Sequence, residues 1–212
     1  MEINQNKITG GVYLVIDPAM ELDLLIPKLQ SAIDGGISVI QIWNNWSPET
    51  DKLYYIRCIA VLCKPLNIPL FINEDWSLLS QTEDLEGVHF DEIPPNIDEI
   101  RKTRNRPILT GITCKGNLET VLWAENNEMT YLSFCAMFPS SSAGSCAIVP
   151  PDIVLKAKLI TDIPFFVSGG ITPENTLTLK NQIPFQGVAV ISGILSKSNP
   201  DHQVKAYAKA LI

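Results

Sequence analysis

The chain has 212 residues, and its 46% hydrophobic and 18% charged content is typical of one globular domain with a sizeable core rather than of a disordered chain. A net charge of −7, with no dense run among the 16 basic residues, argues against nucleic acid as a partner, because neutralising phosphates requires clustered cations. No apolar run approaches the roughly 20 residues that span a bilayer, and the polar first ten residues do not resemble a signal peptide, so we expect no membrane association and a cytoplasmic location.

Eight short, nearly continuously apolar segments recur along the whole chain and predict β-strands. In chain order they are residues 12–17, 38–43, 69–74, 87–91, 108–113, 130–137, 164–168 and 187–192. Strands that are apolar on both faces are typical of a parallel sheet covered by helices.

The segments between these strands carry apolar residues at helical spacing. The predicted buried faces are Leu25, Leu29, Ala32 and Ile33 in the first, Leu53, Ile56, Ala60 and Cys63 in the second, and Val204, Tyr207, Ala208 and Leu211 in the last. Two helix starts are predicted from a capping residue followed by proline and acid, at Ser47 and at Thr172.

This alternation predicts an α/β fold, a single (β/α)₈ TIM barrel that occupies residues 1–212, with residues 1–10 as a polar N-terminal extension. A doubly wound sheet is the alternative, because periodicity alone does not show closure. The five cysteines make no C-x-x-C pair and are expected to be free, mostly buried thiols: Cys58, Cys63, Cys114, Cys135 and Cys146.

Polar residues follow all eight predicted strands. In a barrel this is the edge where ligands bind, although polar residues also mark any boundary between strand and loop. Several of these strand ends form recognisable short motifs, namely Tyr13 to Asp17, Gln41, Ile72-Asn73, Gly87-Val88-His89, Gly111-Ile112-Thr113, Phe138-Pro139, Gly169-Gly170-Ile171 and Gly187 to Ser192.

In their order and spacing, from Val12 to about Leu195, these motifs resemble those of the thiamine phosphate synthase and thiazole tautomerase (TenI-like) family of (β/α)₈ barrels. The resemblance implies a reaction in which an aminopyrimidine diphosphate ionises and a thiazole phosphate nitrogen attacks the resulting cation, releasing pyrophosphate. Mg²⁺ and cationic side chains would stabilise the leaving group. Small phosphorylated thiazole and pyrimidine ligands, and a homodimer, are the partners that this resemblance implies.

The resemblance also implies roles for individual residues. Gln41, Asn73, His89 and the Thr113 position would lie near the pyrimidine, and Ser140 and Ser142 would keep the hydroxyls of the sixth-strand loop. Gly169 and Gly170, with the backbone N–H groups of Ile191 and Ser192, would form a phosphate cradle, since small residues permit close approach. The alternatives are two turn glycines and a structural histidine.

The sequence departs from the family pattern where the diphosphate would lie. The family's second strand reads Gln-Leu-Arg-x-Lys, whereas this chain has Trp43, Asn44 and Asn45 after Gln41-Ile42, and the lysine of the sixth-strand loop is also missing. Each hydrogen bond to a charged group is worth about 1.5–3 kcal/mol, so losing roughly three cationic partners should cost on the order of 5 kcal/mol and a thousandfold or more in rate.

Two acidic residues, Glu74 and Glu92, are predicted to bind Mg²⁺ through oxygen ligands, with Asp75 and Asp91 nearby; a solvated acidic rim is the alternative. Lys115 stands where family members often place a histidine, and we predict catalytic roles for Lys115 and Thr113. A lysine serves as a base only if burial lowers its pKa; otherwise Lys115 is a surface charge.

Three functional classes follow from this pattern. The pyrimidine positions favour a thiamine phosphate synthase with a degenerate diphosphate site, and this is the function that we predict. The missing cations favour either a thiazole tautomerase-like isomerase, which needs an acid/base and a phosphate anchor but no metal, or a non-catalytic barrel that binds a phosphorylated ligand.

Overall fold

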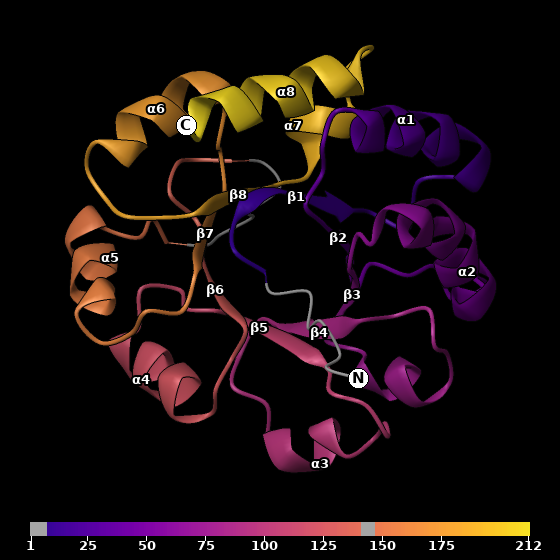
Figure 1. Cartoon of the computed structure of the whole chain (residues 1–212), viewed down its shortest axis with the longest axis horizontal. Coiled ribbons are helices and arrows are strands. Elements are labelled where there is room, and N and C mark those ends of the chain that lie inside the picture. The colour runs from indigo at the N-terminus through magenta and orange to yellow at the C-terminus, as the bar shows by residue number, and fades with distance from the viewer. Residues whose placement is uncertain (1–7, 141–146) are drawn as a thin grey trace.

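The chain folds into a closed barrel of eight parallel strands with helices on its outside (Figure 1), as a computed structural model describes it for residues 8–140 and 147–212. The strands follow chain order around the ring: β1 Gly11–Ile16, β2 Val39–Ile42, β3 Leu70–Asn73, β4 Gly87–Phe90, β5 Leu109–Thr113, β6 Tyr131–Phe134, β7 Phe165–Ser168 and β8 Gly187–Val190. The ring closes where β1 pairs with β8, with Gly11 opposite Gly187. The single (β/α)₈ barrel is therefore confirmed, and the doubly wound sheet is excluded.

Each strand lies where the apolar runs predict one, but most are shorter than predicted. The difference is largest at β6, which ends at Phe134, three residues before the predicted end. Beyond it the backbone turns to bond with other segments: the N–H of Met137 donates to the Ser168 carbonyl, and that of Val149 donates to the Ala136 carbonyl.

Helices follow most strands, although two of the eight segments that follow a strand carry little helix. The α-helices are α1 Leu22–Asp34, α2 Lys52–Cys63, α3 Ile97–Arg101, α4 Leu118–Asn126, α5 Pro151–Lys158, α6 Pro173–Lys180, α7 Ser192–Leu195 and α8 Pro200–Ala210. The 3₁₀-helices are η1 Lys64–Leu66 and η2 Trp76–Ser80. After β3 the connection has only η2, and after β4 it has only the five residues of α3, because prolines at 94 and 95 cannot donate helical hydrogen bonds. None of the described helices is long and apolar enough to cross a membrane.

The predicted start of the second helix was wrong by four residues. Asp51, not Ser47, caps α2, because its carboxylate accepts a hydrogen bond from the Tyr54 N–H at 3.0 Å. Leu53 consequently lies at the exposed edge of the helix, with 37% of its surface accessible, instead of on the buried face. The predicted start at Thr172 is confirmed by a capping box, in which Thr172 and Asn175 bond to each other's backbone N–H groups.

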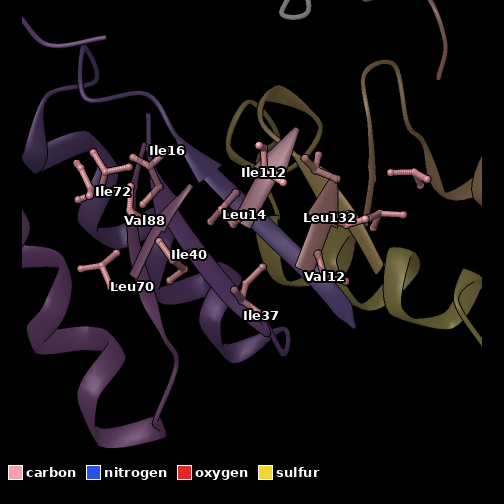
Figure 2. Packing of buried hydrophobic residues seen from close by; sticks show 14 of the residues in the cluster. Val12, Leu14, Ile16, Ile37, Ile40, Leu70, Ile72, Val88, Ile112 and Leu132 are labelled. Carbon is pink, nitrogen blue, oxygen red and sulfur yellow. The ribbon is translucent and has the colours of Figure 1, made fainter. Parts of the chain in front are cut away.

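Two apolar layers hold the barrel together. The larger lies between strands and helices and contains the outward-facing side chains of the strands, such as Leu14, Ile40, Ile72 and Val88 (Figure 2). The smaller fills the barrel interior with inward-facing residues: Ile8, Tyr13, Val39, Phe71, Tyr131, Phe166 and Ala189. Ile8, the first of the described residues, therefore belongs to the core.

The four described cysteines form no disulfide with one another, as predicted. Cys63 and Cys114 are buried, and burial raises the pKa of each to about 12, so both remain protonated and unreactive at neutral pH. Cys58 and Cys135 are half-buried, and Cys146 lies outside the described residues.

Candidate active site

A cavity of about 870 Å³ opens at the carboxyl ends of the barrel strands, where this fold places its active sites. Ten of the thirteen predicted site residues line it: Gln41, Asn73, His89, Thr113, Lys115, Ser140, Gly169, Gly170, Ile191 and Ser192. Ser142 lies outside the described residues. Glu74 and Glu92, the predicted metal ligands, are described but do not line the cavity.

The floor of the cavity is a polar layer directly above the aromatic interior of the barrel. Side chains alternate in and out along a strand, so residues two apart face the same side. Gln41, Asn73, His89 and Thr113 form this layer together with two serines that the sequence analysis missed, Ser133 and Ser168. Ser133 and Ser168 stand two residues after the interior residues Tyr131 and Phe166 of the same strands, and this spacing is the signal that identifies the two serines.

One hydrogen-bonded line crosses the barrel beneath the cavity. The Tyr13 hydroxyl donates to Oε1 of Gln41 at 2.7 Å and lies 2.6 Å from the Tyr131 hydroxyl. The Tyr131 hydroxyl lies 2.8 Å from Nδ1 of His89, whose Nε2 lies 2.9 Å from Oγ1 of Thr113. Tyr13 and Tyr131 were also missed, because a tyrosine within an apolar strand reads as ordinary core.

Burial keeps this line of side chains uncharged. It lowers the pKa of His89 to about 4, against a smaller opposing effect of the Asp91 carboxylate, so the imidazole is neutral at physiological pH. Burial also raises the pKa of Tyr13 and of Tyr131 well above the ordinary tyrosine value. The floor therefore offers hydrogen-bonding groups to the cavity rather than charge.

Backbone atoms fix Asn73 at the edge of this floor. Its Nδ2 donates to the His89 carbonyl, and its Oδ1 accepts from the Asn44 N–H, both at 3.3 Å. With both ends of the amide engaged, Asn73 joins β3 to β4 and to the loop after β2.

The opposite side of the cavity is built for close approach to a ligand. Gly169 and Gly170 follow β7 with φ of +79° and +65°, a conformation that favours glycine. A Cβ on Gly170 would lie 2.7 Å from the Pro139 carbonyl oxygen. Ile191 and Ser192 line the same cavity at the start of α7. The first N–H groups of a helix have no partner within the helix.

Few charges line the cavity. Among the described lining residues there are two lysines, Lys115 and Lys197, and two acids, Asp91 and Glu174. Lys197 was missed, since it follows the eighth-strand motif on the loop after α7. Lys115 is half-exposed, and its Nζ lies 3.1 Å from a Glu92 carboxylate oxygen.

Trp43 lines the cavity at the position where the family pattern has arginine. Trp46 does not line the cavity; it packs edge-on against Tyr55 with ring centroids 5.5 Å apart. Lys52 lies over the Trp46 ring at 5.6 Å and pairs with Asp75 at 2.7 Å. The charge of Lys52 is therefore already neutralised by a carboxylate.

The predicted Mg²⁺ ligands do not form a ready metal site. Within the described residues no group of three His, Cys, Asp or Glu side chains is placed to hold an ion. Glu74, with φ of +61°, accepts the backbone N–H of Asp91, and Glu92 is paired with Lys115. Burial, with the nearby charges of Asp91 and Glu92, raises the pKa of Glu74. The donors as they stand do not fit the octahedral oxygen shell of Mg²⁺.

Known proteins match the chain over nearly its full length. The profile of the family described as Thiamine monophosphate synthase matches residues 12–194. The chain is 26% identical over 205 residues to the thiamine-phosphate synthase of Marinobacter nauticus, covering 96% of this chain and 91% of that protein. It is 28% identical to that of Xylella fastidiosa strain Temecula1, covering 93% and 82%.

A solved structure shares the fold. The thiamine phosphate pyrophosphorylase from Pyrococcus furiosus superposes with a TM-score of 0.81 at 18% identity and covers 98% of both chains. The profile covers most of the barrel, including the strand ends that line the cavity. The chain thus belongs to the thiamine monophosphate synthase family.

Proposed function

We propose that this protein joins an aminopyrimidine diphosphate to a thiazole phosphate, forming thiamine phosphate and releasing pyrophosphate. One observation carries the proposal: a neutral hydrogen-bonding floor and a glycine-lined anion cradle face the same cavity. The curated relatives named thiamine-phosphate synthase support it.

In this proposal the two halves of the cavity hold the two substrates against each other. Gln41, Asn73, His89 and Thr113 bind and orient the pyrimidine ring, and Gly170 with the N–H groups around Ile191 and Ser192 binds the thiazole phosphate. Holding both reactants in one orientation lowers the entropic contribution to the activation barrier, since positioning alone supplies several kcal/mol in favourable cases.

The departing diphosphate requires positive charge, and we assign this role to Lys115 and Lys197. They are the Lys and Arg side chains that line the described part of the cavity. Lys115 lacks the burial that would turn a lysine into a base, so we assign it to charge rather than to proton transfer, and it would exchange its exposed partner Glu92 for the diphosphate. With two cations and neutral residues at positions 43–45, we expect turnover on the order of a thousandfold below that of a synthase with all its cations.

The purified protein mixed with both substrates tests this proposal, with thiamine phosphate measured by chromatography. We expect slow product formation that falls about tenfold or more in Lys115→Ala, since one charge-assisted hydrogen bond is worth about 1.5–3 kcal/mol. Lys209→Ala, on the final helix, is the matched control. Absence of product at any enzyme concentration would contradict the synthase reaction.

The Mg²⁺ prediction is tested in the same assay. Product formation in EDTA at the rate seen with Mg²⁺ would show that the reaction does not require the metal. Dependence on Mg²⁺ that is lost in Glu74→Gln would support the predicted acidic ligands, which would then have to rearrange around substrate oxygens.

A second candidate is a metal-independent isomerase acting on a thiazole phosphate. The balanced charges of the cavity favour it, because proton transfer and a phosphate anchor place no demand on a diphosphate site. Thiazole phosphate binding without any synthase product would select this candidate or a non-catalytic ligand-binding barrel. We also propose a cytoplasmic homodimer, on the family resemblance alone.

A further inference from the structure

Five side chains form the hydrogen-bonded line beneath the cavity, in the order Thr113, His89, Tyr131, Tyr13 and Gln41. They come from strands β5, β4, β6, β1 and β2, so the line crosses the barrel. Each inner member has one hydrogen to donate and one acceptor facing its neighbour. Thr113, His89, Tyr131 and Tyr13 each bring one hydrogen to the four links, so the direction of the link to Gln41 determines the direction of the other three.

The direction is set at the Gln41 end. The Tyr13 hydroxyl donates its only hydrogen to Oε1 of Gln41. In the 2.6 Å contact between the tyrosines, Tyr13 must then accept and Tyr131 must donate. With its hydrogen used, the Tyr131 oxygen is left as an acceptor for the 2.8 Å contact with Nδ1 of His89, which must carry a proton.

The same logic continues to the cavity. A neutral imidazole has one N–H, so with Nδ1 protonated the Nε2 atom accepts, and Thr113 donates its hydroxyl hydrogen across 2.9 Å. The pKa of His89, lowered to about 4 by burial, keeps the ring neutral. Asp91 lies 4.0 Å from Nε2, beyond hydrogen-bond range. Thr113 lines the cavity with its oxygen lone pairs, as an acceptor.

We propose that Tyr13 and Tyr131 are positioning residues that fix the His89 tautomer, so that Thr113 presents an acceptor and Gln41 presents N–H donors to the ligand. Such a pocket favours a flat heteroaromatic ring with an acceptor nitrogen facing Gln41 and an exocyclic amino group facing Thr113. It disfavours the matching ring with a carbonyl, because two acceptors would face each other. The assignment of the His89 tautomer is independent of the proposed function, whereas the preference for an amino-substituted ring rests on it.

Removing the Tyr13 hydroxyl should reverse the hydrogen bonds at His89 and Thr113, although neither residue contacts the site of the change. In Tyr13→Phe, Tyr131 loses the acceptor for its hydrogen and is free to donate to Nδ1 of His89 instead. His89 then carries its proton on Nε2 and donates to Thr113, whose hydroxyl hydrogen turns toward the cavity. A ligand carbonyl becomes acceptable, although Tyr13 and Thr113 do not touch.

Nitrogen-15 NMR of the imidazole tests the tautomer without any ligand. The chain has two histidines, and His202 is a surface residue with 71% of its side chain exposed, so the signals are separable. We expect the Nδ1–H form of His89 in the unmodified protein and a shift toward Nε2–H in Tyr13→Phe. An Nε2–H form in the unmodified protein, or no change in the variant, overturns the inference.

The ligand preference is tested with 4-aminopyrimidine and 4-pyrimidinone as probes, titrated by NMR. We expect the amino compound to bind about tenfold to a hundredfold more tightly, and the ratio to fall below about threefold in Tyr13→Phe. Tyr55→Phe is the control, since Tyr55 is a buried tyrosine whose hydroxyl bonds the Met20 carbonyl outside this line.

The outcomes separate this inference from the synthase proposal. Amino selectivity that depends on Tyr13 but is accompanied by no thiamine phosphate would support the ordered line and contradict the synthase. Thiamine phosphate formation, with the affinity ratio of the two probes unchanged in Tyr13→Phe, would support the synthase and contradict the ordered line. If the affinity ratio falls equally in Tyr55→Phe, the effect comes from general destabilisation of the fold, and the inference is overturned.

Discussion

At the scale of single residues, the burial of His89 couples stability to pH. Its pKa is lowered from the ordinary 6.5 to about 4. Between these values the unfolded chain binds a proton that the folded chain does not, so the free energy of unfolding falls as the pH drops through this window. At 1.36 kcal/mol per pKa unit, the loss is roughly 3 kcal/mol.

Urea unfolding at several pH values between 7 and 4 measures this effect. In His89→Gln, the part of the acid destabilisation that comes from the histidine should disappear. His202→Gln, at an exposed site, should behave as the unmodified protein does. Equal pH dependence in His89→Gln and the unmodified protein would show that His89 is not held neutral by burial.

Gly170 is the residue on which the proposed anion cradle most depends. In Gly170→Ala a side chain would be forced into φ of +65°, with its Cβ 2.7 Å from the Pro139 carbonyl oxygen. We expect a loss of about 1–2 kcal/mol from the backbone conformation, seen as a lower melting temperature, and at least about tenfold weaker phosphate-ester binding by calorimetry. In Gly36→Ala, φ is +100° and no atom lies within 4 Å, so this control should lose stability and keep binding.

The sequence predicts individual site residues where a motif carries them, and misses those that only the barrel geometry brings together. Gln41, Asn73, His89 and Thr113 follow their strands in recognisable motifs, and all line the cavity. Tyr131 lies 118 residues from Tyr13 in the chain, and no local pattern indicates that their hydroxyls meet.

At the scale of secondary structure, the start of α6 links stability to the site. Thr172 caps this helix, accepting the Asn175 N–H, and it also lines the cavity. Thr172→Ala should cost about 1 kcal/mol in unfolding free energy, the usual value of a lost cap. Thr178→Ala, at an exposed position within the same helix, should be neutral or slightly stabilising, and equal effects of the two changes would contradict the capping role.

Strands were easier to predict than helices in this chain. A parallel strand buried on both faces reads as an unbroken apolar run, and all eight were found. The connections after β3 and β4 contain little helix, and the cap of α2 is a lone Asp51 rather than the Ser47 that precedes a proline. Several residues compete for each helix start, and the contacts of the folded chain decide among them.

At the scale of the whole molecule, barrel closure places two unlike surfaces in one cavity. The polar floor comes mainly from strands β2 to β5, and the proposed anion cradle comes from the segments after β7 and β8. Closure between β1 and β8 brings these distant parts of the chain to the same opening. We propose that this cavity holds a heteroaromatic ring and a phosphate together.

Calorimetric titration with thiamine phosphate and with thiamine tests that claim most directly, because it requires no turnover. We predict that thiamine phosphate binds at least about tenfold more tightly than thiamine, since hydrogen bonds to a charged phosphate are worth about 1.5–3 kcal/mol each. We also predict that Gly170→Ala removes most of the difference. Equal affinity for the two compounds, or binding of neither at millimolar concentration, would contradict the account.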